Sequence, residues 1–168
     1  MLNKINNIGI FFEDCYKEWS VREYARAVKI SPPTASKILK ELEKQKFLNK
    51  REDRGFLLFR INRENSVMKH LSQIYWEIKF SEFLEYLEKK LTPSAIVLFG
   101  SLSKLEARKE SDIDIAIFSS IKEEINLYKF EKELGREIQI LRFECFEKVN
   151  KQLKTPILNG CILRGYLS

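Results

Sequence analysis

The chain has 168 residues, of which 44% are hydrophobic and 12% aromatic, and these residues are spread along its whole length. This composition supports one ordinary domain or two small ones with real cores, and it excludes disordered, fibrous and low-complexity proteins. No apolar run approaches the roughly 20 residues of a membrane span, and the first apolar stretch meets Glu13 and Asp14 too early for a secretory signal. We therefore expect a cytoplasmic protein that does not enter a membrane.

The formal net charge of +6 is distributed unevenly. Residues 1–80 contain 16 Lys and Arg against 10 Asp and Glu, whereas residues 81–168 contain 14 of each kind. An excess confined to the first half indicates an N-terminal part that faces a polyanion and a C-terminal part with another role. A lysine-rich surface that is simply solvated is the alternative, and charge alone leaves both open.

Cysteine and histidine usage narrows the chemistry. Cys15, Cys145 and Cys161 are an odd number at wide spacing in apolar surroundings, which predicts buried thiols in a reducing compartment. His70 is the only histidine, which excludes histidine-rich zinc sites and most schemes based on imidazole. Metal chemistry in this chain must therefore rest on carboxylates.

Helix signals follow one another through the first half of the chain. Apolar residues predict a first helix over 6–18, and Ser20 with Glu23 forms the capping box of a second helix that runs to about Val28. Ser31 with Pro32 opens a third helix. Its apolar stripe is Ala35, Ile38, Leu39 and Leu42, and its opposite face is Thr34, Ser36, Lys37, Lys40 and Lys44.

A basic hairpin is predicted after the third helix. The run LNKREDRGFLLFRIN indicates a strand, an Asp-Arg-Gly turn and a second strand. Two short helices joined by a tight turn match the geometry with which a recognition helix enters the DNA major groove. The stretch ISPPTASKILKELEKQKFLNKREDRGF resembles the winged helix-turn-helix domains of prokaryotic transcription regulators, over roughly residues 5–63.

This resemblance implies DNA binding through the third helix and through the hairpin, or wing. The residues expected to face DNA are Thr34, Ser36, Lys37, Lys40, Lys50, Arg51 and Arg54. Winged helices also serve as protein-docking or dimerisation modules, and the sequence leaves that alternative open.

A helical segment without a Gly/Ser-rich linker follows. Apolar residues at helical spacing over 64–91 predict one long helix or two, broken near Phe80 and Ser81, where Ser81 would cap the second. We expect three parts: a winged helix at 1–63, a connecting helix at 64–80 and a second domain at 81–168. Trp76 with Tyr75 belongs either to the core or to a homodimer interface.

The second half carries acidic residues on a buried strand. SAIVLFG, at 94–100, is an apolar strand that runs into Gly-Ser, and SDIDIAIF, at 111–118, is a second strand with Asp112 and Asp114. Residues two apart on a strand share a face, so the two carboxylates should lie side by side. Such a pair calls for a hard divalent cation, Mg²⁺ or Mn²⁺, and Gly100 and Ser101 offer a phosphate site beside it.

Gly-Ser followed after ten residues by Ser-Asp-Ile-Asp, all between two hydrophobic strands, resembles the nucleotidyltransferase superfamily related to DNA polymerase β. Within this superfamily, the sequence resembles the minimal nucleotidyltransferase domains, over roughly residues 82–165. The resemblance implies an α+β protein of two domains, in which the second domain is a small mixed sheet with helices on one side. Gly100, Ser101 and Ser111 would then hold the triphosphate, and Asp112 and Asp114 would hold the metals that align a hydroxyl for attack on the α-phosphate.

Exposed cations near the phosphate loop are further candidates. Lys104 and Arg108 would either contact the triphosphate or remain solvated. The expected function is binding of a nucleoside triphosphate, with ATP favoured, and transfer of AMP to a hydroxyl. The resemblance further implies an antitoxin with a HEPN-type toxin as its partner.

Two positions depart from the family pattern. Leu105 stands where the family often has glycine, and the place of a third carboxylate, between apolar neighbours in REIQILRF, is held by Gln139. Glutamine offers a carbonyl oxygen but cannot act as a base. Glu137, two residues earlier on the same face, would activate the nucleophile in its place if the strand is shifted. An active transferase and a catalytically degenerate domain used for sensing or dimerisation therefore both stay open.

Overall fold

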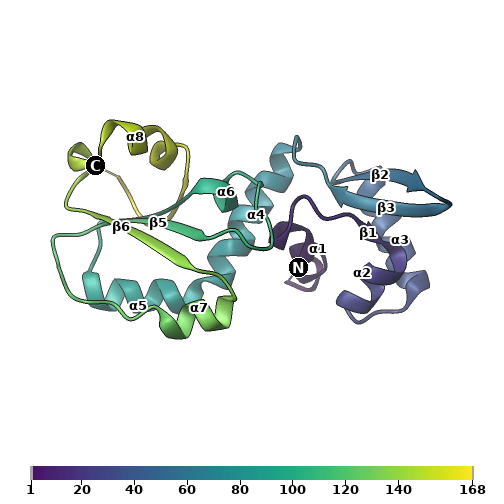
Figure 1. Ribbon diagram of the computed structural model, residues 1–168, viewed down its shortest axis with the longest axis horizontal. Helices are drawn as coiled ribbons and strands as arrows, with labels where there is room; N and C mark the ends of the chain where they lie inside the picture. The colour runs from purple at the N-terminus through teal and green to yellow at the C-terminus, as the bar shows by residue number, and fades with distance from the viewer. Residues whose placement is uncertain (1, 168) are drawn as a thin grey trace. The chain divides into compact units, whose positions relative to one another are not determined.

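The computed structural model describes residues 2–167, with side chains from residue 7 onward. The chain forms two compact units, Met1–Ser72 with Leu105–Lys109 and Gln73–Lys104 with Glu110–Ser168. Each is described by itself below (Figure 1). Within residues 2–167, none of the helices combines the length and the apolar character of a membrane-spanning segment.

The N-terminal unit combines helices with a small antiparallel sheet. Its strands lie in the order β1-β3-β2. Its elements are α1 (Leu2–Glu13), β1 (Trp19–Ser20), α2 (Val21–Ala27), α3 (Pro32–Lys44), β2 (Leu48–Asp53), β3 (Phe56–Ile61) and the first half of α4 (Ser66–Lys79). Its buried core includes Phe11, Phe12, Tyr24, Leu39 and Phe59.

Two of the predicted helix starts are confirmed at the level of their caps. The Ser20 hydroxyl accepts from the Glu23 amide while the Glu23 carboxylate accepts from the Ser20 amide, which completes the capping box of α2. The Ser31 hydroxyl accepts from the backbone of Thr34 at the start of α3. The prediction of a first helix over 6–18 is wrong at its end, because α1 stops at Glu13.

The predicted wing, formed by β2 and β3, is a tight hairpin. Asp53 faces Phe56, and the two-residue turn between them, Arg54-Gly55, has φ values of 49° and 79°. Positive φ at both positions is typical of the turn whose twist matches that of the strands, and Gly55 adopts it without strain. Phe56 is 61% exposed, so the end of the hairpin is not part of the core.

The C-terminal unit is built on a four-stranded sheet in the order β6-β5-β4-β7. β4 is antiparallel to β5 and β7, whereas β5 and β6 are parallel, so the predicted mixed sheet is confirmed. Besides the second half of α4, its elements are α5 (Ser81–Leu91), β4 (Ala95–Phe99), α6 (Gly100–Ser103), β5 (Ile113–Phe118), α7 (Tyr128–Leu134), β6 (Ile138–Phe143), a 3₁₀ turn (Phe146–Lys148), α8 (Lys151–Leu158) and β7 (Cys161–Gly165).

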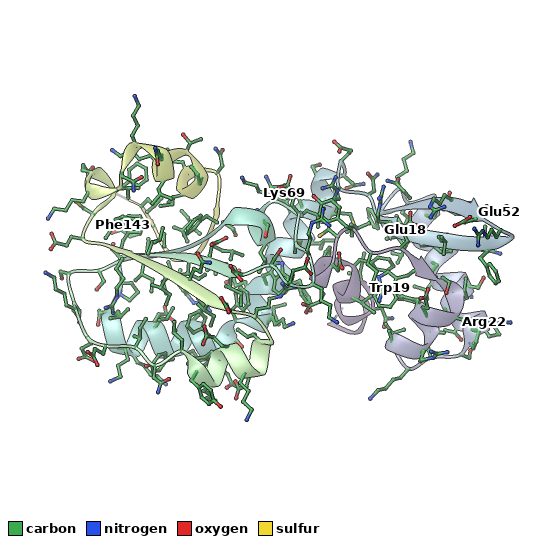
Figure 2. All side chains as sticks on the ribbon, viewed as in Figure 1. Glu18, Trp19, Arg22, Glu52, Lys69 and Phe143 are labelled. Carbon is green, nitrogen blue, oxygen red and sulfur yellow. The ribbon has the colours of Figure 1, made fainter. Side chains whose placement is uncertain are left out.

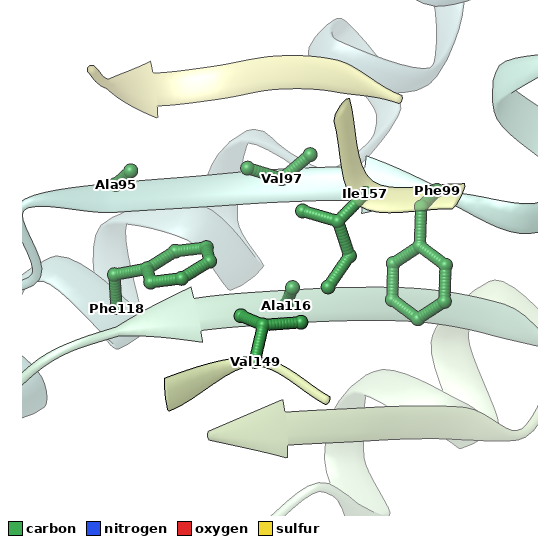
Figure 3. Close-up of a cluster of buried hydrophobic side chains, with 7 residues drawn as sticks. All are labelled: Ala95, Val97, Phe99, Ala116, Phe118, Val149 and Ile157. Carbon is green, nitrogen blue, oxygen red and sulfur yellow. The ribbon is translucent and has the colours of Figure 1, made fainter. Parts of the chain in front are cut away.

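Helices cover both faces of this sheet, which corrects the expectation of helices on one side. Every residue of β4 is buried, so both of its faces need a cover. On one face, Val149, which precedes α8, and Ile157 of α8 close a cluster with β4 and β5 (Figure 3). α5 and α7 lie on the other face (Figure 1) and meet through Phe83 and Phe130, whose ring centroids are 5.1 Å apart.

Two smaller expectations also needed correction. The helical segment does break at Phe80, but the Ser81 side chain makes no capping hydrogen bond, and the buried Phe80 ring occupies the bend. The cysteines are free thiols, yet only Cys15 is fully buried, while Cys145 and Cys161 are partly exposed. Burial and then the nearby Glu77 carboxylate raise the pKa of Cys161.

Candidate functional site

Gly100 brings the first carboxylate of the site against the backbone. It follows β4 with a φ of +72°, and β4 and β5 place Phe99 opposite Asp114. A Cβ atom on residue 100 would lie 2.0 Å from the Oδ2 atom of Asp114. Only glycine therefore allows the Asp114 carboxylate to occupy this position, beside the Gly100-Ser101 turn.

Asp112 lies just outside the strand that was expected to carry it. β5 begins at Ile113, whose amide donates to the carbonyl of Glu137 at 2.8 Å and starts the parallel ladder with β6. The side chain of Asp112 is held instead by Gln139, whose Nε2 donates to Oδ2 of Asp112 at 2.7 Å. An amide thus stands where the family resemblance places a third carboxylate.

The electrostatics of the pair fit a cation. Asp114 is half-buried, and its pKa is raised first by this burial and then by the charge of Asp112. Two carboxylates and an amide that also has a carbonyl oxygen suit a hard divalent ion. Glu137 is exposed and precedes β6. Among the residues that the structure describes, no three Asp, Glu, His or Cys side chains converge on one metal position.

Removal of the Asp114 charge should stabilise the metal-free fold. The pKa of Asp114 is raised in the folded protein, so its ionised form lowers the stability of the fold. This loss of stability is complete at a pH above the folded-state pKa. It disappears as the pH falls toward the ordinary aspartate pKa of about 3.9. We expect Asp114→Asn to have a higher melting temperature than wild type at pH 7 in EDTA. The difference should shrink at lower pH and on addition of Mg²⁺, and thermal melts across pH would measure it. A variant that melts lower than wild type in EDTA would contradict this.

The other residues predicted to bind the nucleotide differ in their exposure. Ser101 is partly exposed and Lys104 is exposed. The carbonyl of Ser111 accepts a hydrogen bond from Nη1 of Arg136 at 2.5 Å. Arg136 carries no signal in the sequence, because an arginine that precedes a strand is exposed by default. Arg108 belongs to the N-terminal unit, where its guanidinium lies 3.9 Å from the ring centroid of Tyr16.

Leu105 has a left-handed backbone conformation, which favours glycine. Its φ is +62°, and its side chain is completely buried. A left-handed conformation costs an L-residue roughly 1–2 kcal/mol. Burial of the leucine side chain offsets that cost, which explains why the departure from the family pattern is tolerated.

This balance predicts an unusual order of stabilities. Leu105→Ala loses the buried side chain and keeps the strain, so we expect it to lower the unfolding free energy by about 3 kcal/mol. Leu105→Gly loses the same contacts but releases the strain, so its loss should be about 1 kcal/mol smaller. Urea titration would measure both. A glycine variant less stable than the alanine variant would contradict the assignment.

The predicted DNA-binding residues fall into two groups. On α3, Thr34, Lys37 and Lys40 are exposed and Ser36 is half-buried, and no ion pair is recorded for either lysine within the described chain. On the wing, Arg51 binds Glu18 through Nε at 2.8 Å and Nη2 at 2.5 Å, and Lys50 lies 3.5 Å from Glu43.

Acidic side chains lie on and beside the wing as well (Figure 2 labels Glu18 and Glu52). The hydrogen bond and charge of Arg51 lower the pKa of Glu18. Among the predicted DNA-binding cations that the structure describes, those outside an ion pair are therefore Lys37 and Lys40 of α3 and Arg54 at the hairpin turn.

Comparison with known proteins locates the site within a family. Residues 82–163 match the family model described as "Polymerase beta, Nucleotidyltransferase". The C-terminal part of the chain thus matches a polymerase β-like nucleotidyltransferase domain. The match contains Gly100, Ser101, Asp112 and Asp114. No curated protein and no solved structure gave a significant match.

Proposed function

We propose that the nucleotidyltransferase domain binds a nucleoside triphosphate, with ATP as the first candidate, together with Mg²⁺ or Mn²⁺, and transfers AMP to a hydroxyl acceptor. The observation that carries the proposal is the close approach of the Asp114 carboxylate to Gly100, with Asp112 beside it, in a domain that matches the family. Binding of ATP in Mg²⁺ and its loss in EDTA, measured by equilibrium dialysis, test the first half of the proposal.

Each residue has a defined role in this scheme. Asp112 and Asp114 hold the cation, which neutralises the triphosphate when bound. Gly100 leaves room for the phosphates, and the hydroxyls of Ser101 and Ser111 and the ammonium group of Lys104 donate to phosphate oxygens. The acceptor oxygen forms a bond to the α-phosphorus as the bond to the bridging oxygen breaks and pyrophosphate leaves. The hydroxyl proton passes to Glu137.

A second candidate function rests on Gln139. Its amide donates to Asp112, so the site has one negative charge fewer than a site with a third carboxylate there. A domain of this kind would bind the nucleotide and sense it without turnover. Retention of ATP by the protein without any transfer of label would favour this second function.

We propose that the N-terminal unit is a winged helix that binds DNA through α3. Helices α2 and α3 followed by the β2–β3 hairpin, together with the unpaired cations of α3, support it. In this proposal, α3 and the wing contact the DNA backbone, and these residues specify no base preference.

Neutralisation of Lys37 and Lys40 should weaken DNA binding in a salt-dependent way. The slope of log affinity against log salt is negative, and each lost phosphate contact reduces its magnitude by about 0.9. Lys37→Ala/Lys40→Ala should therefore reduce the magnitude of the slope by about 2. Titration of a 30-base-pair duplex of random sequence at several salt concentrations measures this slope. Lys129→Ala/Lys132→Ala, on α7, is the matched control. An unchanged slope, or no binding by wild type at low salt, would contradict the proposal.

The partner proposals extend the same scheme. The resemblance to minimal nucleotidyltransferase domains makes a HEPN-type toxin a candidate acceptor, and the protein its antitoxin. Transfer of label from ATP to such a protein, dependent on Asp112 and Asp114, would support that role. A homodimer is a separate proposal, which light scattering of the purified chain tests.

A further inference from the structure

Asp112 needs a support that its own secondary structure does not provide. It precedes β5, unlike Asp114, which lies within the strand. The parallel ladder begins one residue later, where the Ile113 amide donates to the carbonyl of Glu137. The Ser111-Asp112 peptide therefore depends on a contact from a side chain outside the strand.

Arg136 is placed to provide this support. It follows the left-handed Gly135 that ends α7, and its backbone amide bonds to the carbonyl of Glu131. Its side chain is only 8% exposed, and its Nη1 donates to the carbonyl of Ser111 at 2.5 Å. The buried guanidinium therefore hydrogen-bonds the peptide group that joins Ser111 to Asp112.

A rigid aromatic surface fixes the guanidinium in turn. The central carbon of the Arg136 guanidinium lies 5.4 Å from the ring centroid of Trp76. Trp76 is fully buried and stacks on Phe80, with ring centroids 5.4 Å apart. The planar guanidinium can stack on the indole and donate sideways at once, which an ammonium group cannot do.

We propose that Arg136 is a positioning residue that holds Asp112 in the geometry needed to bind the cation, acting through the Ser111 carbonyl. This rests on the proposed function only where it concerns the cation. The restraint on the Ser111-Asp112 backbone is a claim about the metal-free protein. The two parts therefore have separate readouts.

The experiment compares Arg136→Lys with Arg142→Lys in the full chain. Arg142 is the matched control, because its Nη2 also donates to a backbone carbonyl, that of Glu123 at 2.6 Å, on the other end of β6. Hydrogen exchange of the metal-free protein reads the restraint on residues 110–114. Titration with Mn²⁺, followed by the paramagnetic resonance of the free ion, reads the cation site.

We expect Arg136→Lys to speed exchange at 110–114 about tenfold, to leave β4 protected, and to weaken Mn²⁺ binding about tenfold. Arg142→Lys should leave both readouts at wild-type values. Unchanged exchange at 110–114, or equal loss of protection across β4 and β5, would overturn the positioning role. Changed exchange with unchanged Mn²⁺ affinity would overturn its link to the cation. A wild-type protein that binds no Mn²⁺ would defeat the proposed function, while the exchange result still decides the restraint.

Discussion

Asp112→Asn/Asp114→Asn is expected to lower the affinity for ATP in Mg²⁺ by about 100-fold or more. The two carboxylates are the only charged side chains assigned to the cation, and Asp114 lies against the Gly100 turn where the phosphates would bind. Amides keep the size of these side chains but remove both charges, and a 100-fold loss corresponds to about 2.7 kcal/mol. Calorimetric titration of the nucleotide in Mg²⁺ and in EDTA measures the effect.

The control for this variant is Asp53→Asn. This substitution also replaces a carboxylate with an amide, but on the wing of the N-terminal unit, so it should leave ATP affinity unchanged. The double variant should also keep its fold, because loss of the Asp114 charge removes a penalty on the folded state. Equal ATP affinity in the double variant and wild type would place the nucleotide elsewhere.

Gln139→Glu is expected to raise Mn²⁺ affinity and the rate of transfer about tenfold or more. A carboxylate at this position adds a negative charge and replaces a donor to Asp112 with a ligand oxygen. The same change places a third carboxylate beside those of Asp112 and Asp114, which already repel each other. The variant should therefore melt below wild type in EDTA and gain more stability than wild type when Mn²⁺ is added.

A matched substitution separates the metal effect from simple repulsion. Gln45 donates from Nε2 to Glu41 at 2.8 Å on the surface of the N-terminal unit, so Gln45→Glu also places a carboxylate beside a carboxylate. It should not gain stability from Mn²⁺ beyond the wild-type gain. If Gln139→Glu behaves like Gln45→Glu, residue 139 does not face the cation.

The parts of this protein that sequence predicts well are those decided by neighbouring residues. The caps at Ser20 and Ser31 depend on groups three positions away, and the hairpin turn depends on the Arg54-Gly55 pair. The sequence also predicted Gly100-Ser101 beside the two aspartates, because Gly-Ser and Asp-x-Asp border two apolar runs that were expected to form buried strands.

The parts that sequence could not give depend on distant contacts. Whether helices cover one face of the sheet or both depends on where α8 packs, which no local pattern records. The burial of Arg136 requires the Trp76 ring, 60 positions earlier in the chain. The tolerance of Leu105 in a left-handed conformation requires complete burial of its side chain, which the local sequence does not show, so the pattern could only mark it as a departure.

Transfer of label from ATP labelled at the α-phosphate, in Mg²⁺ and cell extract, tests the central claim most directly. The account predicts that wild type passes the label to an acceptor and that Asp112→Asn/Asp114→Asn does not, with Gln139→Glu faster than wild type. Equal transfer by wild type and the double aspartate variant would contradict the assignment of these carboxylates. No transfer by either protein or by Gln139→Glu, even with ATP bound, would contradict the transferase and leave the nucleotide sensor.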